Sequence, residues 1–153
     1  MPAILDGEIA YADVLAELGR CADHVIFSQR GLEAFSGTDV KLGLGRMIGF
    51  GARVAAVTRG DAGVAWIESN APEVVQQCPA FPVDAVDTLA AGDVFHGAYA
   101  YALAMAEGAG IGAAMRFASA AAAIKCTRPG GRSGAPNRAE VEALLAGEAK
   151  DSG

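Results

Sequence analysis

The sequence predicts an α/β fold in which short β-strands alternate with amphipathic helices. β-Branched and aromatic residues gather in short runs such as DHVIFS at residues 23–28, which are typical of buried strands. Between such runs, apolar residues recur at helical spacing, as at Val14, Leu15 and Leu18. The chain has 153 residues and is 52% hydrophobic, which excludes a disordered chain and suits helices packed on a sheet. This alternation implies a parallel sheet covered on both faces.

The expected elements follow one another through short connections. Strands are predicted at residues 2–7, 23–28, 52–60 and 63–69. Helices are predicted at residues 11–22, 31–36, 40–51, 92–107, 111–125 and 137–146. Residues 73–86 are expected to be extended, because Pro79 and Pro82 interrupt them. The Gly-rich segment at residues 127–137 is short and is interpreted as a loop, so one domain is expected.

Charge and composition exclude several classes of function. The formal net charge is −6, and a field of that sign repels nucleic-acid backbones. No stretch is long and apolar enough for a membrane span, and the N-terminus lacks the basic region of a secretory signal. The three cysteines, Cys21, Cys78 and Cys126, are far apart and are expected to be buried, reduced thiols. A cytoplasmic location is therefore expected.

The segment DTLAAGDVFHGA, residues 87–98, joins a turn of small residues to the start of a predicted helix. Ala90, Ala91 and Gly92 keep the backbone accessible, and the first amides of a helix have no intrahelical partner. Such a helix N-terminus is suited to binding an anion such as a phosphoryl group. Asp93 in the first turn could act as a general base beside that group. The alternative is that the turn and Asp93 only cap the helix.

This segment resembles the C-terminal signature of the ribokinase-like, or PfkB, carbohydrate kinases. The signature D-T-x-[GA]-A-G-D-x-F-x-G is matched at every defined position from Asp87 to Gly97. VTRGDAG at residues 57–63 resembles the family's nucleotide loop, and residues 116–136 resemble its helix and loop at adenine. The resemblance implies the C-terminal half of a three-layer α/β/α Rossmann-like ribokinase fold with a mostly parallel sheet. Residues 1–153 would form a single partial domain, and the absent N-terminal half would supply the lid and most of the sugar pocket.

The resemblance also implies roles for individual residues. Asp93 corresponds to the catalytic base, and Ala90, Ala91 and Gly92 correspond to the anion hole. The residues that correspond to ATP-binding positions are Thr58, Gly60, Gly63, Ser119 and Gly92. A monovalent cation site, for K⁺, would be formed by Asp87, Leu89, Cys126 and Gly131. The implied cofactors are ATP, Mg²⁺ and K⁺.

Two departures from the family pattern and two further candidates bear on the site. Where the family usually has N-x-x-E, the chain reads Ser28-Gln29-Arg30-Gly31, which puts the usual Mg²⁺ arrangement in doubt. Ser119 stands where several relatives have an Asn near adenine, and its hydroxyl can still donate and accept a hydrogen bond. Arg59 could contact a phosphate or be solvated. His96, three residues after Asp93, could face the substrate or only the solvent.

These observations favour an ATP-dependent phosphotransferase acting on a hydroxyl of a sugar or sugar-like small molecule, with Asp93 as the base. The alternative is a nucleotide-binding half-domain without catalysis, because the sugar pocket is expected mostly outside this half. A Rossmann dehydrogenase is disfavoured, since no G-x-G-x-x-G opens the first helix. The expected partner is a small-molecule sugar, and a homodimer is a further possibility.

Overall fold

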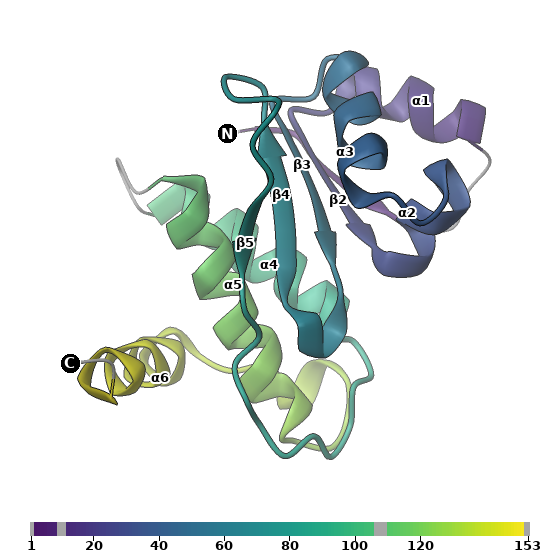
Figure 1. Cartoon of the computed structure of the whole chain (residues 1–153). Helices are drawn as coiled ribbons and strands as arrows, with labels where there is room; N and C mark the ends of the chain where they lie inside the picture. The colour runs from purple at the N-terminus through teal and green to yellow at the C-terminus, as the bar shows by residue number, and fades with distance from the viewer. Residues whose placement is uncertain (1, 9–11, 106–109, 152–153) are drawn as a thin grey trace. The chain divides into compact units, whose positions relative to one another are not determined.

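The computed structural model describes residues 2–8, 12–105 and 110–151 (Figure 1). It divides into two compact units, residues 1–79 and residues 80–153. The first unit contains a sheet with three helices, and the second contains three helices and the turns that join them. The α/β class is therefore confirmed, while the expectation of one partial domain stays a prediction.

Five strands form the sheet of the first unit, in the spatial order β1-β2-β3-β4-β5. They are β1 (Ile4–Gly7), β2 (His24–Ser28), β3 (Val54–Thr58), β4 (Val64–Glu68) and β5 (Gln76–Cys78). The pairs β1–β2 and β2–β3 are parallel, because helices α1 (Ala12–Cys21), α2 (Gln29–Ser36) and α3 (Val40–Gly49) return the chain. The pairs β3–β4 and β4–β5 are antiparallel, so the sheet is mixed. The β3–β4 connection is too short for a parallel crossover.

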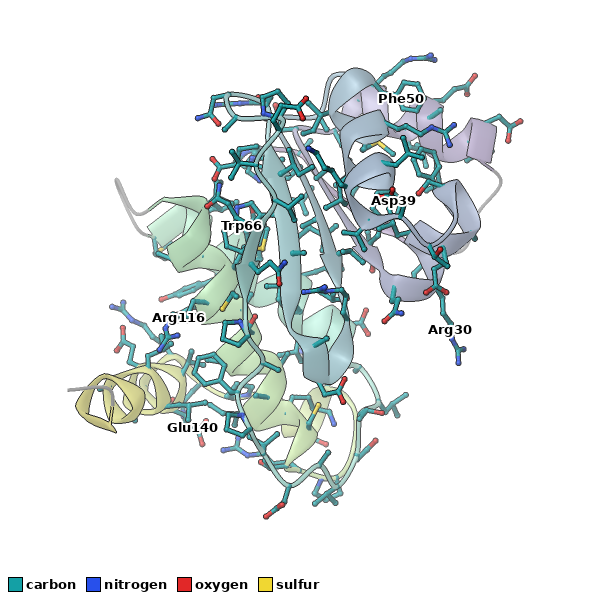
Figure 2. The ribbon with its side chains drawn as sticks, in the orientation of Figure 1. Arg30, Asp39, Phe50, Trp66, Arg116 and Glu140 are labelled. Atoms are coloured by element: carbon teal, nitrogen blue, oxygen red, sulfur yellow. The ribbon has the colours of Figure 1, made fainter. Side chains whose placement is uncertain are left out.

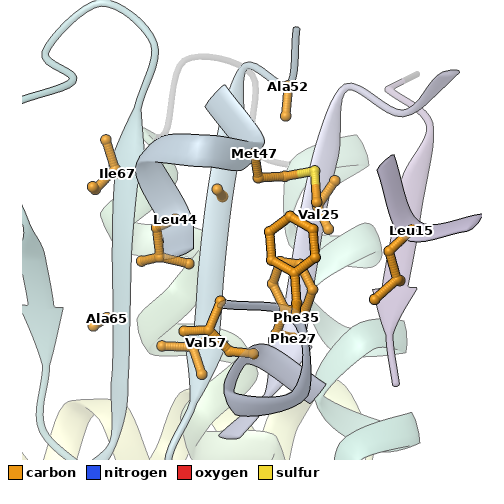
Figure 3. Packing of buried hydrophobic residues seen from close by; sticks show 12 residues of the cluster. Leu15, Val25, Phe27, Phe35, Leu44, Met47, Ala52, Val57, Ala65 and Ile67 are labelled. Carbon is orange, nitrogen blue, oxygen red and sulfur yellow. The ribbon is translucent and has the colours of Figure 1, made fainter. Parts of the chain in front are cut away.

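The core of the first unit lies between the sheet and its three helices. Alternate residues of β2 and β3, including Val25, Phe27 and Val57, point toward this core and are fully buried (Figure 3). From α2, Phe35 stacks on Phe27 with ring centroids 5.6 Å apart. Met47 of α3 fills the remaining space. The inward-facing strand residues, which recur every second position, thus pack against the apolar faces of the helices in one core.

The second unit is built around two helices that pack along each other, α4 (Ala91–Met105) and α5 (Ile111–Cys126) (Figure 1). The buried face of α5 is mostly alanine, which permits a close approach of neighbouring backbones. Helix α6 (Arg138–Asp151) packs on α5 through Val141. The helices expected at residues 92–107, 111–125 and 137–146 are confirmed over their described residues.

A reciprocal cap fixes the start of α6. The Glu140 amide donates to Asn137 Oδ1 at 3.1 Å, and the Asn137 amide donates to Glu140 Oε2 at 2.8 Å. Arg128 also holds Glu140, with 2.6 Å between Nη2 and Oε1, and Glu140 is labelled in Figure 2. This pairing raises the pKa of Arg128 and lowers that of Glu140. The loop before α6 is thereby tied to the helix that follows it.

Three smaller expectations can also be compared with the structure. The cysteines are free, but Cys21 is exposed and Cys126 half-buried, so only Cys78 fits the expectation of a buried thiol. The surface position of Cys21 near the end of α1 explains that difference. The sequence also predicts that Trp66, in the strand run at residues 63–69, packs in the core or on the sheet. Trp66 is buried on β4, and its indole donates to Glu68 (Figure 2). Among the described residues, no helix is both long and apolar enough to cross a bilayer.

Candidate functional site

The turn before α4 presents backbone amides with little side-chain cover. The Asp87 carboxylate accepts from the Leu89 amide at 2.8 Å, and this bond tightens the turn. Ala90 has a φ of 63°, and it is the one non-glycine residue with positive φ in the described part of the chain. Its carbonyl accepts the first i→i−4 bond of the helix, from Val94. The amides of Gly92 and Asp93 therefore precede the helical hydrogen-bond ladder.

The chemistry available at this turn is that of an anion site with a carboxylate beside it. Ala90 and Ala91 are half-buried, Gly92 and Asp93 are exposed, and a Cβ on Gly92 would meet no atom within 4 Å. The helix dipole places positive potential at these amides. Holding Ala90 in the left-handed region costs about 1 kcal/mol. Such local strain is typical of a turn that the surrounding structure imposes.

His96 lies one turn into α4 and turns back toward the same segment. Its Nδ1 is 2.9 Å from the Gly92 carbonyl oxygen. The imidazole also contacts the Phe95 ring edge-on, with centroids 6.1 Å apart. This contact supports the first turn of α4. A role for His96 toward substrate stays a prediction.

The predicted nucleotide loop forms the connection between β3 and β4. Gly60 and Gly63 have φ values of 57° and 78°, which explains why glycine stands at these positions. Thr58, at the end of β3, donates to the Phe27 carbonyl at 3.3 Å. Arg59 is half-buried and its guanidinium donates to the Ala62 carbonyl at 3.2 Å, so the side chain braces its own loop. Arg59 is therefore partly solvated, and a contact with phosphate stays a prediction.

The segment that departs from N-x-x-E forms the closed start of α2. Ser28 Oγ accepts from the Gly31 amide at 3.0 Å and so caps the helix. A Cβ at Gly31 would collide with the Gly7 carbonyl oxygen, so the backbone leaves no space for the family's Glu. Arg30 is exposed and points away from the ribbon (Figure 2). The missing carboxylate thus coincides with a close approach of α2 to β1 at Gly31.

Four residues predicted for a cation site gather around the turn before α4. The Cys126 carbonyl accepts from the Val86 amide at 2.7 Å and from the Asp87 amide at 3.1 Å. Leu89 and Ala90 lie beside Gly131, whose Cβ position would be 3.6 Å from Ala90 Cβ. The Gly131 carbonyl accepts from the Gly134 amide at 3.1 Å. These carbonyl oxygens already accept protein hydrogen bonds.

The Asp87 carboxylate is the charged group of this cluster. Hydrogen bonds from the Leu89 and Gly130 amides lower its pKa, and the nearby Lys125 ammonium acts in the same direction. Burial opposes this shift. Lys125 is fully buried, with Nζ 2.8 Å from the Asp87 carbonyl oxygen. Sequence reasoning did not single out Lys125, although it continues the buried face of α5, seven residues after Ala118.

Ser119 is buried on α5, with 8% of its surface exposed. Its predicted role at adenine stays a prediction. For a divalent metal, the described residues contain no group of three or more His, Cys, Asp or Glu side chains placed to hold an ion.

This turn lies in the segment that matches the PfkB signature at every defined position. The sequence matches the pfkB family carbohydrate kinases over residues 1–138, and the chain belongs to that family. The ribokinase of Bacillus subtilis is 46% identical over 89 residues, which are 58% of this chain and 29% of that protein.

Solved structures agree with this assignment. The ribokinase of Thermotoga maritima is 36% identical with a TM-score of 0.80, over 94% of this chain and 48% of that one. A proposed ribokinase from Agrobacterium tumefaciens is 43% identical with a TM-score of 0.87, over 97% of this chain and 48% of that one. The ribokinase-like fold is therefore confirmed. The chain spans about half the length of these structures.

Proposed function

We propose that this chain supplies the ATP site and the general base of a phosphotransferase that moves the γ-phosphoryl group of ATP onto a hydroxyl of a sugar or sugar-like molecule. The observation that carries the proposal is the open start of α4, where the free amides of Gly92 and Asp93 stand beside an exposed carboxylate. Phosphoryl transfer needs positioning and charge stabilisation more than covalent chemistry. Helix-start amides and one carboxylate supply those needs.

Each group at the turn has a separate task in this reaction. The amides of Gly92 and Asp93 donate hydrogen bonds to the phosphoryl oxygens. The Ala91 amide donates to the Thr88 carbonyl within the turn, and the strained Ala90 holds that turn in shape. The Asp93 carboxylate accepts the proton of the attacking hydroxyl. Magnesium, when bound to the nucleotide, neutralises phosphate charge. The residues proposed to contact the nucleotide are Thr58, Gly60, Gly63 and Ser119.

Relatives support the choice of ligands. A structure of Arabidopsis thaliana ribokinase, 26% identical, is described as a complex with ribose and ATP. A structure of Vibrio cholerae fructokinase, 28% identical, is described as bound to fructose, ADP and a potassium ion. We infer ATP as the donor and a sugar as the acceptor for this chain on that basis. The potassium ion in that structure supports testing for a cation at the residues predicted for this chain, which include Asp87.

A second function follows from the length of the chain. Because the chain spans about half of its ribokinase relatives, it could bind nucleotide without transferring a phosphoryl group. The free amides of the α4 start lie within this half, so this alternative keeps the same ATP site. This alternative differs from the phosphotransferase only in that no phosphoryl group is transferred.

Calorimetric titration with Mg·ATP and with NAD, followed by an assay for ADP release with ribose and fructose, tests both functions. Binding of ATP but not NAD, with sugar-dependent ADP release, supports the kinase. Binding without turnover, unchanged when a ribokinase N-terminal half is supplied, supports the nucleotide-binding alternative. Absence of ATP binding contradicts both.

A further inference from the structure

The end of α5 carries a fully buried ammonium group. Lys125 has 0% of its surface exposed, and its Nζ donates to the Asp87 carbonyl oxygen at 2.8 Å and to the Arg128 carbonyl oxygen at 3.2 Å. The Asp87 carboxylate oxygen Oδ2 is 3.9 Å away. A buried charge is tolerated only where it is paired and hydrogen-bonded, and this ammonium has both kinds of partner.

The loop after α5 leaves room for this side chain. A Cβ at Gly134 would lie 3.0 Å from Lys125 Cδ and 3.3 Å from Arg128 Cβ. A larger residue at position 134 would therefore compete with the lysine stem for the same space. Glycine at 134 and lysine at 125 form a matched pair of residues.

The ammonium connects the turn before α4 to the loop that follows α5. Asp87 Oδ1 accepts from Leu89 within the turn, and Asp87 Oδ2 accepts from the Gly130 amide at 2.9 Å in the loop. Lys125 binds the Asp87 carbonyl on one side and the Arg128 carbonyl on the other. The Lys125 ammonium thus adds a charged contact between α5 and the turn before α4, beside the Cys126 carbonyl, which accepts from the Val86 and Asp87 amides.

A monovalent inorganic cation does not fit this arrangement. Hard cations bind carbonyl and carboxylate oxygens. Of the residues predicted for the cation site, Lys125 engages Asp87, and its other acceptor is the nearby Arg128 carbonyl. Nζ lies within hydrogen-bond distance of these two carbonyl oxygens, so a second cation on the same oxygens would stand next to a fixed positive charge. An ammonium is a compact point charge, suited to the position of such an ion.

We propose that the Lys125 ammonium takes the place of the monovalent cation at this cluster and orders the turn before α4 without potassium. Lys125 is then a positioning residue that acts through Asp87 on the amides of the turn. Its importance for phosphoryl binding rests on the proposed function. The charge substitution itself does not, because it concerns the folded chain in the absence of nucleotide.

The first test uses the unaltered chain. Thermal unfolding is followed in chloride salts of K⁺, Na⁺, Rb⁺ and choline at constant ionic strength, without nucleotide. The proposal predicts the same unfolding midpoint in all four salts. A midpoint that is several degrees higher in K⁺ than in choline would show a bound cation and overturn the proposal.

The second test compares Lys125→Ala with Lys125→Met. Truncation to alanine leaves an empty space lined by carbonyl oxygens, so K⁺ or NH₄⁺ should raise the unfolding midpoint of Lys125→Ala by several degrees over choline. Methionine keeps the aliphatic stem and fills the space, so Lys125→Met should be destabilised in every salt alike. Equal behaviour of the two variants in all salts, including failure of both to fold in K⁺, would contradict the proposal.

A nucleotide titration separates this inference from the proposed function. If the unaltered chain binds Mg·ATP with the same affinity in K⁺ and in choline, both ideas are supported. If it binds ATP only in K⁺, the kinase assignment stands and the lysine substitution falls. If it never binds ATP, yet its unfolding does not depend on the salt and K⁺ rescues Lys125→Ala, the lysine substitution stands and the kinase assignment falls.

Discussion

The starts of α2 and α4 are both built from small residues, but the start of α2 is capped and the start of α4 is open. At α2, the Ser28 hydroxyl accepts from the Gly31 amide, and the Gly7 carbonyl fills the space beside Gly31. At α4, Ala90 has no side-chain oxygen to cap the helix, and the space beside Gly92 is open. The first start is capped by the protein itself, and at the second the Gly92 and Asp93 amides are proposed to bind a ligand.

The difference shows what makes a helix start a binding site. The dipole and the unpaired amides belong to every α-helix, and they are available to an anion only where no side chain caps them. In this chain the segment that departs from N-x-x-E lacks the carboxylate and has a serine cap at α2. At α4 the Ala91 amide donates to the Thr88 carbonyl, and the amides of Gly92 and Asp93 come before the first helical hydrogen bond, from Val94 to Ala90. The proposed anion site is therefore at the start of α4.

The largest expected effect is the loss of the base at the open start. Asp93→Ala should lower the rate of phosphoryl transfer by about 10²–10⁴-fold, the usual contribution of a general base. ATP affinity should change by less than about threefold, because the amide donors remain. The rate is measured by ADP release, with a ribokinase N-terminal half supplied if the chain alone has no turnover. Asp13→Ala, which removes an acid from the first turn of α1, is the matched control and should leave transfer unchanged.

Crowding the open start should cost affinity without unfolding the protein. Gly92→Val places a branched side chain where the phosphoryl group is proposed to bind, and should weaken Mg·ATP binding by about tenfold, or roughly 1.4 kcal/mol. Calorimetry measures the affinity. Gly147→Val in α6, where a Cβ also meets no atom within 4 Å, is the control. Equal ATP affinity of the two variants would rule out the phosphoryl position.

Filling the closed start should instead destabilise the fold. Gly31→Ala forces a Cβ onto the Gly7 carbonyl and should lower the free energy of unfolding by about 1–3 kcal/mol. Gly45→Ala in α3 meets no atom within 4 Å and should raise it by about 0.5–1 kcal/mol. Denaturant titration measures both. A stabilised Gly31→Ala would mean that α2 does not pack tightly on β1.

The smallest expected effect is the pH dependence of stability that comes from Asp87, in the turn before α4. The pKa of Asp87 in the folded protein is held below its ordinary value of 3.8, chiefly by the Leu89 and Gly130 amides. A depressed pKa stabilises the fold above the unfolded value, and that stability is lost as the pH falls through the folded value. Asp87→Asn should therefore be less stable than the unaltered chain at pH 7.

The stability gap between Asp87→Asn and the unaltered chain should narrow as the pH falls below 3.8. Unfolding midpoints measured between about pH 2 and pH 7 follow the gap. A stability gap that stays constant over this range would contradict the claim that Asp87 is ionised and hydrogen-bonded in the folded protein.

Much of the fold could be predicted from the sequence because its signals are local. Strand runs such as DHVIFS and the helical spacing of Val14, Leu15 and Leu18 depend on nearby residues only. The antiparallel half of the sheet was less apparent, because Gly60 and Gly63 turn β3 back into β4 without a helix. The alternation of strands and helices does not distinguish such a hairpin from a parallel pair.

The candidate site was only partly predictable. The signature from Asp87 to Gly97 identified the open helix start, since the pattern itself is local. The collision that excludes a side chain at Gly31 involves Gly7, which is 24 positions away, and no local pattern indicates it. Lys125 was missed because its carbonyl partners come from a turn 38 positions earlier and from the following loop.

The central claim is that phosphoryl oxygens bind the amides at the start of α4, and amide NMR tests it most directly. Mg·ATP is titrated into ¹⁵N-labelled protein while the resonances of Gly92, Asp93 and Gly31 are followed. The account predicts large shifts of the Gly92 and Asp93 amides, larger with Mg·ATP than with AMP, and an unchanged Gly31 amide. Saturating ATP that leaves Gly92 and Asp93 unmoved would contradict it.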